Sequence, residues 1–317
     1  MSTTSAPEEL DALHIPVFEF PWTGHCSPTA TSIEQQSNAW LSRLGLIADE
    51  HCAAKVAKAR FGWLAARCYP HAEPTLLQTI ADYLAWFFLF DDLVDRVSTF
   101  SPTTITHLTA IIDVLDLDQL SPAPFAQEVA WLDICRRLKQ QLTDEQFQRF
   151  AQSMRTWTST CGLLLLNQIH RQPVNTRQHQ TLRRHTSGVD ACMVLVDIAS
   201  PAPLSPEDYH RADLQQLRLH ANNIASWSND IQSLVKELQE PGPHGNLVTS
   251  HAALGHTLQV SVDFVAQRVR DEISLFSRLA QSVSPHAAPG ICHYITATQD
   301  WLRGYQDWIE NDTQRYA

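Results

Sequence analysis

Hydrophobic side chains recur at helical spacing along most of the chain. Leu84, Phe87 and Phe88 are an example, because they follow the period of three to four residues that one buried helix face requires. No segment shows the alternation of a half-buried strand. The pattern predicts helices over residues 31 through the fifties, 74–97, 103–117, 123–141, 144–168, 180–199, 205–240, 255–283 and 287–311. These elements define an all-α protein.

Several of the predicted helices begin with a capping signal. Thr31 with Glu34, and Thr143 with Gln146, have the spacing of a capping box, in which two side chains satisfy backbone N–H groups reciprocally. Ser205 precedes a proline, which is favoured at the first position of a helix. We therefore expect helices to start near these three places.

The chain divides into a short irregular arm and one large domain. Residues 1–30 contain four prolines that interrupt a helix, so we expect an irregular N-terminal arm. Residues 31–317 show no linker-like shift in composition and no internal repeat. We expect a single antiparallel bundle of about ten or more helices around a deep apolar pocket.

Composition excludes some classes of partner. The 317 residues carry a formal net charge of −11 and no basic stripe, so the chain does not resemble a nucleic-acid-binding protein. The most apolar stretch, residues 83–90, is too short to span a bilayer, and we expect no stable membrane insertion. The seven cysteines lack metal-binding spacing, and the N-terminus does not resemble a signal peptide. A cytoplasmic protein with reduced thiols is expected.

An aspartate-rich motif stands near the end of the predicted 74–97 helix. Asp91 and Asp95 are one helical turn apart, so their carboxylates project from the same face. At about 6 Å, two such anions repel by roughly 2–3 kcal/mol at an effective dielectric constant near 20. A cation that binds both relieves this repulsion, and oxygen ligands favour Mg²⁺. The alternative is a solvated acidic helix end.

A second group of oxygen donors follows much later in the chain. Asn229, Ser233 and Glu237 are spaced by four residues, which aligns an amide, a hydroxyl and a carboxylate along one helix face. Hard oxygen donors of this kind suit a further Mg²⁺. Lys236 can point towards a phosphate. The alternative is a polar stripe on an amphipathic helix, but two such motifs in one all-α chain are an improbable coincidence.

These two motifs resemble those of the class I terpene synthases, especially the compact single-domain microbial type that includes sesquiterpene synthases. Members of that family carry D-D-x-x-D and N-D-x-x-S-x-x-x-E motifs on opposing helices, and both are intact here. The resemblance extends from about residue 16 to residue 316. It implies three Mg²⁺ ions, with Mn²⁺ as a substitute, held between the motifs and an isoprenoid diphosphate.

The resemblance also implies a diphosphate-sensing segment ahead of the second motif. Arg183 corresponds to the sensor, Thr186 to the linker and Ser187 to the effector position, where the helix bends. Many relatives have glycine at the effector position, so Ser187 is a departure. Arg184 is the alternative sensor.

The chain end resembles the family's terminal Arg-Tyr pair, which binds diphosphate when the active site closes. Arg315 and Tyr316 occupy these positions. Upstream, Trp301, Gly304 and Trp308 resemble the aromatic pattern of the family's last helix. Trp308 stands one residue further from Arg315 than this pattern has it, which leaves the direction of its side chain open.

Aromatic side chains are candidates for the wall of the pocket. An aromatic face stabilises a passing carbocation by about 0.5–2 kcal/mol, and an aromatic wall excludes water. Phe87 and Phe88 precede Asp91 by about one turn and are the strongest candidates. Others are Phe61, Trp86 and Trp308.

The resemblance implies a terpene synthase that ionises and cyclises an isoprenoid diphosphate, with farnesyl diphosphate suited to the size of the chain. Geranyl and geranylgeranyl diphosphate remain alternatives. A chain-elongating prenyl diphosphate synthase is a second alternative, although it requires another aspartate-rich motif where this chain has Asn229, Ser233 and Glu237. A non-catalytic isoprenoid-binding helical protein is the third. A homodimer is possible for each of them.

Overall fold

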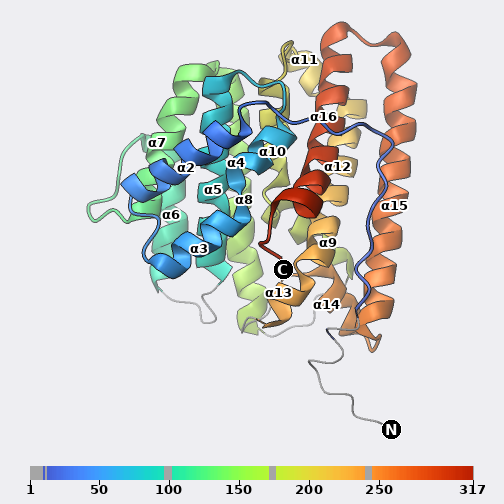
Figure 1. Ribbon diagram of the computed structural model, residues 1–317, viewed down its shortest axis with the longest axis horizontal. Coiled ribbons are helices and arrows are strands. Elements are labelled where there is room, and N and C mark those ends of the chain that lie inside the picture. Colours follow the sequence, from blue (N-terminus) through green and yellow to red (C-terminus); the bar gives the residue numbers. More distant parts are fainter. Residues whose placement is uncertain (1–9, 11–12, 96–101, 171–175, 240–244, 317) are drawn as a thin grey trace.

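The computed structural model describes Leu10 and residues 13–95, 102–170, 176–239 and 245–316. Every regular element in these ranges is a helix, so the expectation of an all-α fold is confirmed (Figure 1). The long helices are α2 (Ala30–Arg43), α3 (Glu50–Ala59), α4 (Phe61–Cys68), α5 (Pro74–Asp95), α6 (Pro102–Leu117), α7 (Ala126–Gln141), α8 (Asp144–His170), α9 (Thr176–Thr186), α10 (Val189–Ile198), α12 (Ala212–Gln232), α15 (Leu258–Val283) and α16 (Pro289–Asp307). Shorter elements are α11 (Pro206–Tyr209), α13 (Leu234–Gln239), α14 (Leu247–Ala252), the 3₁₀ turn η1 (Ser284–His286) and the π-helix η2 (Trp308–Asp312).

The helix predicted from residue 31 onwards is divided into α2 and α3. The break contains Gly45, whose φ of +72° lies in the left-handed region. The capping box predicted at its start is wrong, because the Glu34 carboxylate instead accepts the N–H of Gly62 at 2.7 Å. Glu34 thereby joins α2 to the start of α4.

The other two capping signals are confirmed. Thr143 N–H donates to Gln146 Oε1 at 3.0 Å, and Gln146 N–H donates to Thr143 Oγ1 at 3.2 Å. Ser205 Oγ accepts the N–H of Asp208 at 3.1 Å. The helix that Ser205 begins is short, however, and the single helix predicted from residue 205 is divided into α11, α12 and α13.

The core of the bundle surrounds α5. This helix packs against α2, α4 and α7, while α12 packs against α15 on the other side of the molecule (Figure 1). Trp86 of α5 stacks on Trp131 of α7 with ring centroids 4.4 Å apart, and its Nε1 donates to the Gln127 carbonyl at 2.8 Å. Trp86 is therefore a core residue, which corrects its prediction as a cavity residue.

The described part of the N-terminal arm, from residue 13 onwards, lies against the bundle. His14 N–H donates to Gln259 of α15 at 2.9 Å, and the Trp22 ring packs edge-on against Phe276 of the same helix. Further along, Ser27 N–H donates to the Ala66 carbonyl of α4 at 2.9 Å. The arm thus runs along α15 and across α16 to reach α4 (Figure 1).

None of the helices in the described ranges combines the length and the hydrophobicity that a membrane span requires.

Candidate active site

The three donors of the second motif share one helix face although two helices carry them. Asn229 is in α12, Glu237 is in α13, and Ser233 lies between the two helices with a right-handed helical conformation. The N–H of Ser233 donates to the Asn229 carbonyl at 2.8 Å, and the N–H of Glu237 donates to the Ser233 carbonyl at 2.9 Å. Helical spacing therefore continues across the junction.

Hydrogen bonds hold these donors in place. Ser233 Oγ lies 2.6 Å from Glu237 Oε1, and Asn246 Nδ2 donates to Glu237 Oε2 at 2.8 Å. The same Asn246 amide donates to the Asp230 carbonyl at 2.7 Å. Asn246 precedes α14 and escaped the sequence analysis, because no motif marks a residue that positions a ligand from a separate loop.

Arg183 lies directly against the second motif. Its Nη2 donates to Asn229 Oδ1 and its Nε to Asp230 Oδ1, both at 2.7 Å. Burial alone lowers the pKa of Arg183, but the charges of Asp230, Glu237 and Asp91 outweigh this effect and raise it. The guanidinium is therefore a permanent cation at this site.

Asp230 is the buried partner of Arg183. Burial by itself raises the pKa of the Asp230 carboxyl, but the Arg183 charge and several hydrogen bonds hold it below its ordinary value. Arg184, the alternative sensor, faces elsewhere: its Nη2 lies 3.3 Å from Thr181 Oγ1, and it lines a separate groove with Asp190. The geometry favours Arg183 over Arg184 as the predicted sensor, because Arg183 contacts Asn229 and Arg184 does not.

On the opposite side, α5 presents its aspartates. Asp92 accepts Arg315 Nη2 at 2.7 Å and lies 3.4 Å from Lys236 Nζ. Asp91 lines a cavity that Asn229 also lines. Asp95 is the last residue of α5, but its side chain lies outside the described residues. Asp92 was not among the predicted site residues, although it stands within the motif.

The chain end brings Arg315 and Tyr316 into the same place. Tyr316 Oη and Tyr305 Oη each accept Asn229 Nδ2 at 3.0 Å. Between them, the N–H of Thr313 donates to the Trp308 carbonyl, which closes a π-turn with one residue more than an α-turn contains. This turn lies where the spacing between Trp308 and Arg315 exceeds the family pattern by one residue.

The predicted bend ahead of the second motif lies between α9 and α10. Gly188 has a φ of +73°, and a Cβ on it would lie 2.2 Å from Phe87 Cζ. Glycine is required here both by the backbone conformation and by the close approach of the ring. Thr186 is buried and its carbonyl accepts Trp157 Nε1 at 3.0 Å, while Ser187 faces the cavity.

One mainly apolar cavity, with a volume of about 80 Å³, connects these groups. Asp91 and Arg183 are its charged members, and Asn229 lies with them. Its remaining lining residues are Leu64, Cys68, Leu84, Phe87, Phe88, Ser187, Val189, Cys192, Ala225, Ser226, Trp301 and Tyr305. Both metal motifs therefore face the same hollow.

Two of the predicted wall residues lie elsewhere. Trp308 is fully buried, and its Nε1 donates to the carbonyls of Ala59 and Arg60, which draws the indole away from the cavity. Phe61 stacks on Phe88 with centroids 5.1 Å apart and lines a neighbouring cavity of about 230 Å³.

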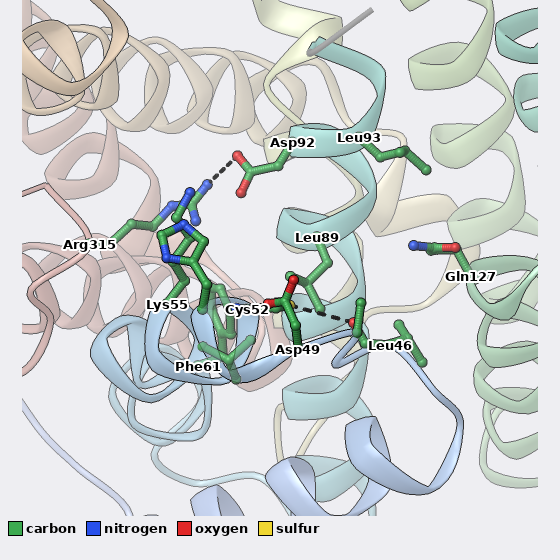
Figure 2. Close-up of a pocket in the computed structure, with 13 residues that line it drawn as sticks. Leu46, Asp49, Cys52, Lys55, Phe61, Leu89, Asp92, Leu93, Gln127 and Arg315 are labelled. Carbon is green, nitrogen blue, oxygen red and sulfur yellow. Dashed lines mark hydrogen bonds and ion pairs between the residues drawn. The ribbon is translucent and has the colours of Figure 1, made fainter. Parts of the chain in front are cut away.

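Figure 2 shows this neighbouring cavity, beside α5. Asp92 and Arg315 point towards one another across its upper end, while Phe61 and Lys55 lie below them. The Arg315 guanidinium also lies over the Phe88 ring, 4.9 Å from its centroid. Phe88 and Arg315 thus stand between the two cavities.

The donor set fits a hard divalent cation. Every predicted ligand offers an oxygen atom, which suits Mg²⁺ and disfavours metals that prefer nitrogen or sulfur. Ser233 Oγ and Glu237 Oε1 are already in contact, and the amide of Asn229 lies against Arg183, a cation. The Arg183 guanidinium therefore places positive charge next to Asn229, one of the predicted metal ligands.

An all-helical bundle with two facing groups of oxygen donors at one apolar cavity defines a class of metal-dependent enzymes that act on diphosphates. Residues 82–275 match the family model described as terpene synthase family 2, C-terminal metal binding. The chain belongs to this family, which establishes it as a terpene synthase that depends on a divalent metal.

Individual relatives agree with this assignment. The chain is 48% identical to a (+)-corvol ether B/(+)-corvol ether A synthase of Kitasatospora setae, over 96% of this chain and 95% of that protein. It is 47% identical to a sesquiterpene synthase of Metarhizium brunneum, over 98% and 91% of the two chains. The crystal structure of a linalool/nerolidol synthase from Streptomyces clavuligerus shares the fold, with a TM-score of 0.81 at 21% identity and coverage of 92% and 99%.

Proposed function

We propose that this enzyme ionises farnesyl diphosphate with Mg²⁺ and cyclises the resulting cation to a sesquiterpene hydrocarbon or alcohol. The observation that carries the proposal is that Asp91 and Asn229 line one mainly apolar cavity, which supports a metal site with ligands from both motifs at its rim. A diphosphate held at this rim has its hydrocarbon chain directed among Phe87, Phe88 and Trp301.

The proposed ligands of three Mg²⁺ ions are Asp91 and Asp95 on one side and Asn229, Ser233 and Glu237 on the other. Bound ions neutralise the charge that develops on the departing diphosphate. The protein contributes rigid positions for its own donors, and the bonds from Ser233 and Asn246 keep the Glu237 carboxylate directed at the site. Mn²⁺ has similar ligand preferences and is proposed as a substitute.

Four side chains are proposed to bind the diphosphate: Arg183, Lys236, Arg315 and Tyr316. In the structure, Arg183 and Tyr316 bond to Asn229, while Lys236 and Arg315 pair with Asp92. A diphosphate offers the cations stronger, charge-assisted partners. Substrate binding therefore exchanges these contacts, and Thr186 and Ser187, which follow Arg183, are placed to transmit the movement to the bend at Gly188.

The cavity must also widen. Its volume of about 80 Å³ is below the range of roughly 300–1,000 Å³ typical for ligand pockets. Release of Arg183 and Tyr316 from Asn229 is a local change that enlarges its polar end. The ring of Phe87 is fixed against Gly188 and remains as a wall that faces the cation.

The relatives support the substrate. The Kitasatospora setae enzyme is named as cyclising (2E,6E)-farnesyl diphosphate, and it resembles this chain at nearly full length. Geranyl and geranylgeranyl diphosphate are the competing substrates. Chain elongation is disfavoured because Asn229, Ser233 and Glu237 stand where a second aspartate-rich motif is needed. A cytoplasmic location and a homodimer stay predictions.

Parallel incubations with geranyl, farnesyl and geranylgeranyl diphosphate test the proposal. With Mg²⁺ we expect farnesyl diphosphate to have the highest kcat/KM and to give cyclic products by gas chromatography–mass spectrometry. Longer prenyl diphosphates as the main products would contradict cyclisation. Absence of turnover with all three substrates would contradict the function itself.

A further inference from the structure

A group of metal-binding side chains lies outside the proposed diphosphate site. His25 comes from the N-terminal arm, His71 from the turn between α4 and α5, and Asp300 from α16. His25 Nδ1 lies 2.8 Å from Asp300 Oδ1, and His71 Nε2 lies 3.4 Å from Asp300 Oδ2. One ligand atom from each residue falls within 4.8 Å of the others.

The Asp300 carboxylate is the buried member of this group. Its side chain is 4% exposed, whereas those of His25 and His71 are 47% and 59% exposed. Asp300 Oδ2 has no hydrogen-bond partner among the described residues. A buried carboxylate requires a compensating positive charge, and two accessible imidazole rings next to it are the ligands that transition metals prefer.

We propose that His25, His71 and Asp300 bind one Zn²⁺ ion. Zinc takes histidine nitrogen at about 2.0–2.1 Å and carboxylate oxygen at about 2.0–2.2 Å in a tetrahedral arrangement, so neighbouring ligand atoms lie about 3.3 Å apart. In the structure the His25 nitrogen lies beside Oδ1 and the His71 nitrogen beside Oδ2 of the same carboxylate, so the two rings flank it, and the three ligand atoms within 4.8 Å of one another are near enough to converge on one ion. Mg²⁺ is disfavoured because two of the three donors are nitrogen.

A metal ion here joins three segments that are far apart in the sequence. The arm that carries His25 otherwise reaches the bundle through contacts such as the bond from Ser27 to Ala66. Binding to the folded protein stabilises it in proportion to the logarithm of the zinc concentration relative to Kd. The ion therefore fixes the arm to the turn after α4.

Zinc binding is tested on the full chain in excess Mg²⁺, which occupies the oxygen-rich motifs. Equilibrium dialysis with metal analysis compares wild type with His71→Ala and His25→Ala. The matched control is His293→Ala, which removes a histidine of the same region that is not in the group. We expect wild type and control to bind about one more Zn²⁺ per chain than either test variant.

Thermal unfolding and Co²⁺ absorption give two further readouts. Zn²⁺ is expected to raise Tm in wild type and control only, and Co²⁺ to give the intense bands of tetrahedral nitrogen coordination in the same two proteins. Equal zinc binding by wild type and His71→Ala, or no zinc binding by wild type, would overturn the proposal.

A second observation concerns the part of the active-site cavity that Cys68 lines. A second hollow of about 200 Å³ lies beside it and includes the side chains of Tyr69, Val196 and Ala297. Cys68 lines both the cavity and this hollow, which we call the base hollow. The Cys68 side chain is buried, with its Sγ 3.6 Å from the Trp301 carbonyl. It is the part of α4 that separates the two spaces.

We infer that Cys68 limits the length of the isoprenoid chain that the cavity accepts. The inference rests on the proposed function. Farnesyl diphosphate ends before the partition, whereas the additional isoprene unit of geranylgeranyl diphosphate needs the base hollow. Removal of the Cys68 side chain joins the two spaces and gives that unit the apolar faces of Tyr69, Val196 and Ala297, next to the zinc group, since His71 and Asp300 line the same hollow.

The variants Cys68→Ala and Cys68→Gly test this inference, with Cys192→Ala as the matched control. Cys192 is also a buried cavity thiol, but it does not line the base hollow. The kcat/KM ratio of geranylgeranyl to farnesyl diphosphate is expected to rise by about tenfold in a Cys68 variant and to stay near the wild-type ratio in Cys192→Ala. An unchanged ratio in both Cys68 variants, or an equal rise in the control, would overturn it. The proposed function fails separately, if wild type does not turn over farnesyl diphosphate.

Discussion

The two sides of the proposed metal site are held by different kinds of contact. On the α12–α13 side, Glu237 is bonded to Ser233 and Asn246, which lie within ten residues of it and belong to the permanent packing. On the α5 side, Asp92 is paired with Lys236 and Arg315, which are proposed substrate ligands. The Glu237 carboxylate is therefore held by permanent contacts, whereas Asp92, like Asn229, is bonded to side chains that a diphosphate competes for. Substitutions on the two sides should differ accordingly.

Loss of a metal ligand on either side has the largest expected effect. Asn229→Ala or Asp91→Ala should lower product formation by about a thousandfold or more, because electrostatic stabilisation of the leaving group is lost. Far-UV circular dichroism should stay nearly unchanged. Full turnover in either variant would remove the metal assignment from that side.

Removal of a cation from the α5 side comes next. Arg315→Ala should reduce kcat/KM for farnesyl diphosphate by about 10–100-fold, because one charge-assisted bond to the substrate is lost. Arg184→Ala is the matched control, since Arg184 faces a different groove, and it should change kcat/KM by less than about twofold. Equal losses of kcat/KM in the two variants would show that each arginine acts only through its net positive charge and not through a direct contact with the substrate.

A substitution at Ser233, on the α12–α13 side, should change the dependence of the rate on Mg²⁺ concentration. Ser233→Ala should raise the Mg²⁺ concentration needed for half-maximal rate by about tenfold or more, because a ligand and the support of Glu237 are both lost. Ser228→Ala is the control, since Ser228 is a buried serine of the neighbouring helix α12 and its Oγ has no partner among the described residues. An unchanged Mg²⁺ dependence would place Ser233 outside the site.

The spacing of the sequence motifs identified the proposed metal ligands, because that spacing is local, and the family resemblance identified the bend and the terminal Arg-Tyr pair. Neither predicted Asn246 or Asp92, whose roles arise from contacts between distant segments. Trp308 was misplaced for a related reason: its indole bonds to Ala59 and Arg60, and periodicity in one helix does not reveal the carbonyls that another helix presents. Local signals thus identify donors, and tertiary packing decides their partners.

The smallest expected effect concerns the bend between α9 and α10, at Gly188. Gly188→Ala should lower the free energy of unfolding by about 1–3 kcal/mol, because φ is positive and Phe87 occupies the space. Gly45→Ala has nearly the same φ but nothing within 4 Å, so it should cost about 1 kcal/mol. Equal values in chemical denaturation would mean that Phe87 moves aside without cost.

The most direct test of the account is diphosphate release from farnesyl diphosphate at saturating Mg²⁺, compared with the same enzyme in excess EDTA. The account predicts release together with terpene formation in Mg²⁺, loss of both on chelation, and full recovery when Mg²⁺ is added back. Release at an undiminished rate in EDTA would contradict the claim that two facing sets of oxygen donors act through divalent ions.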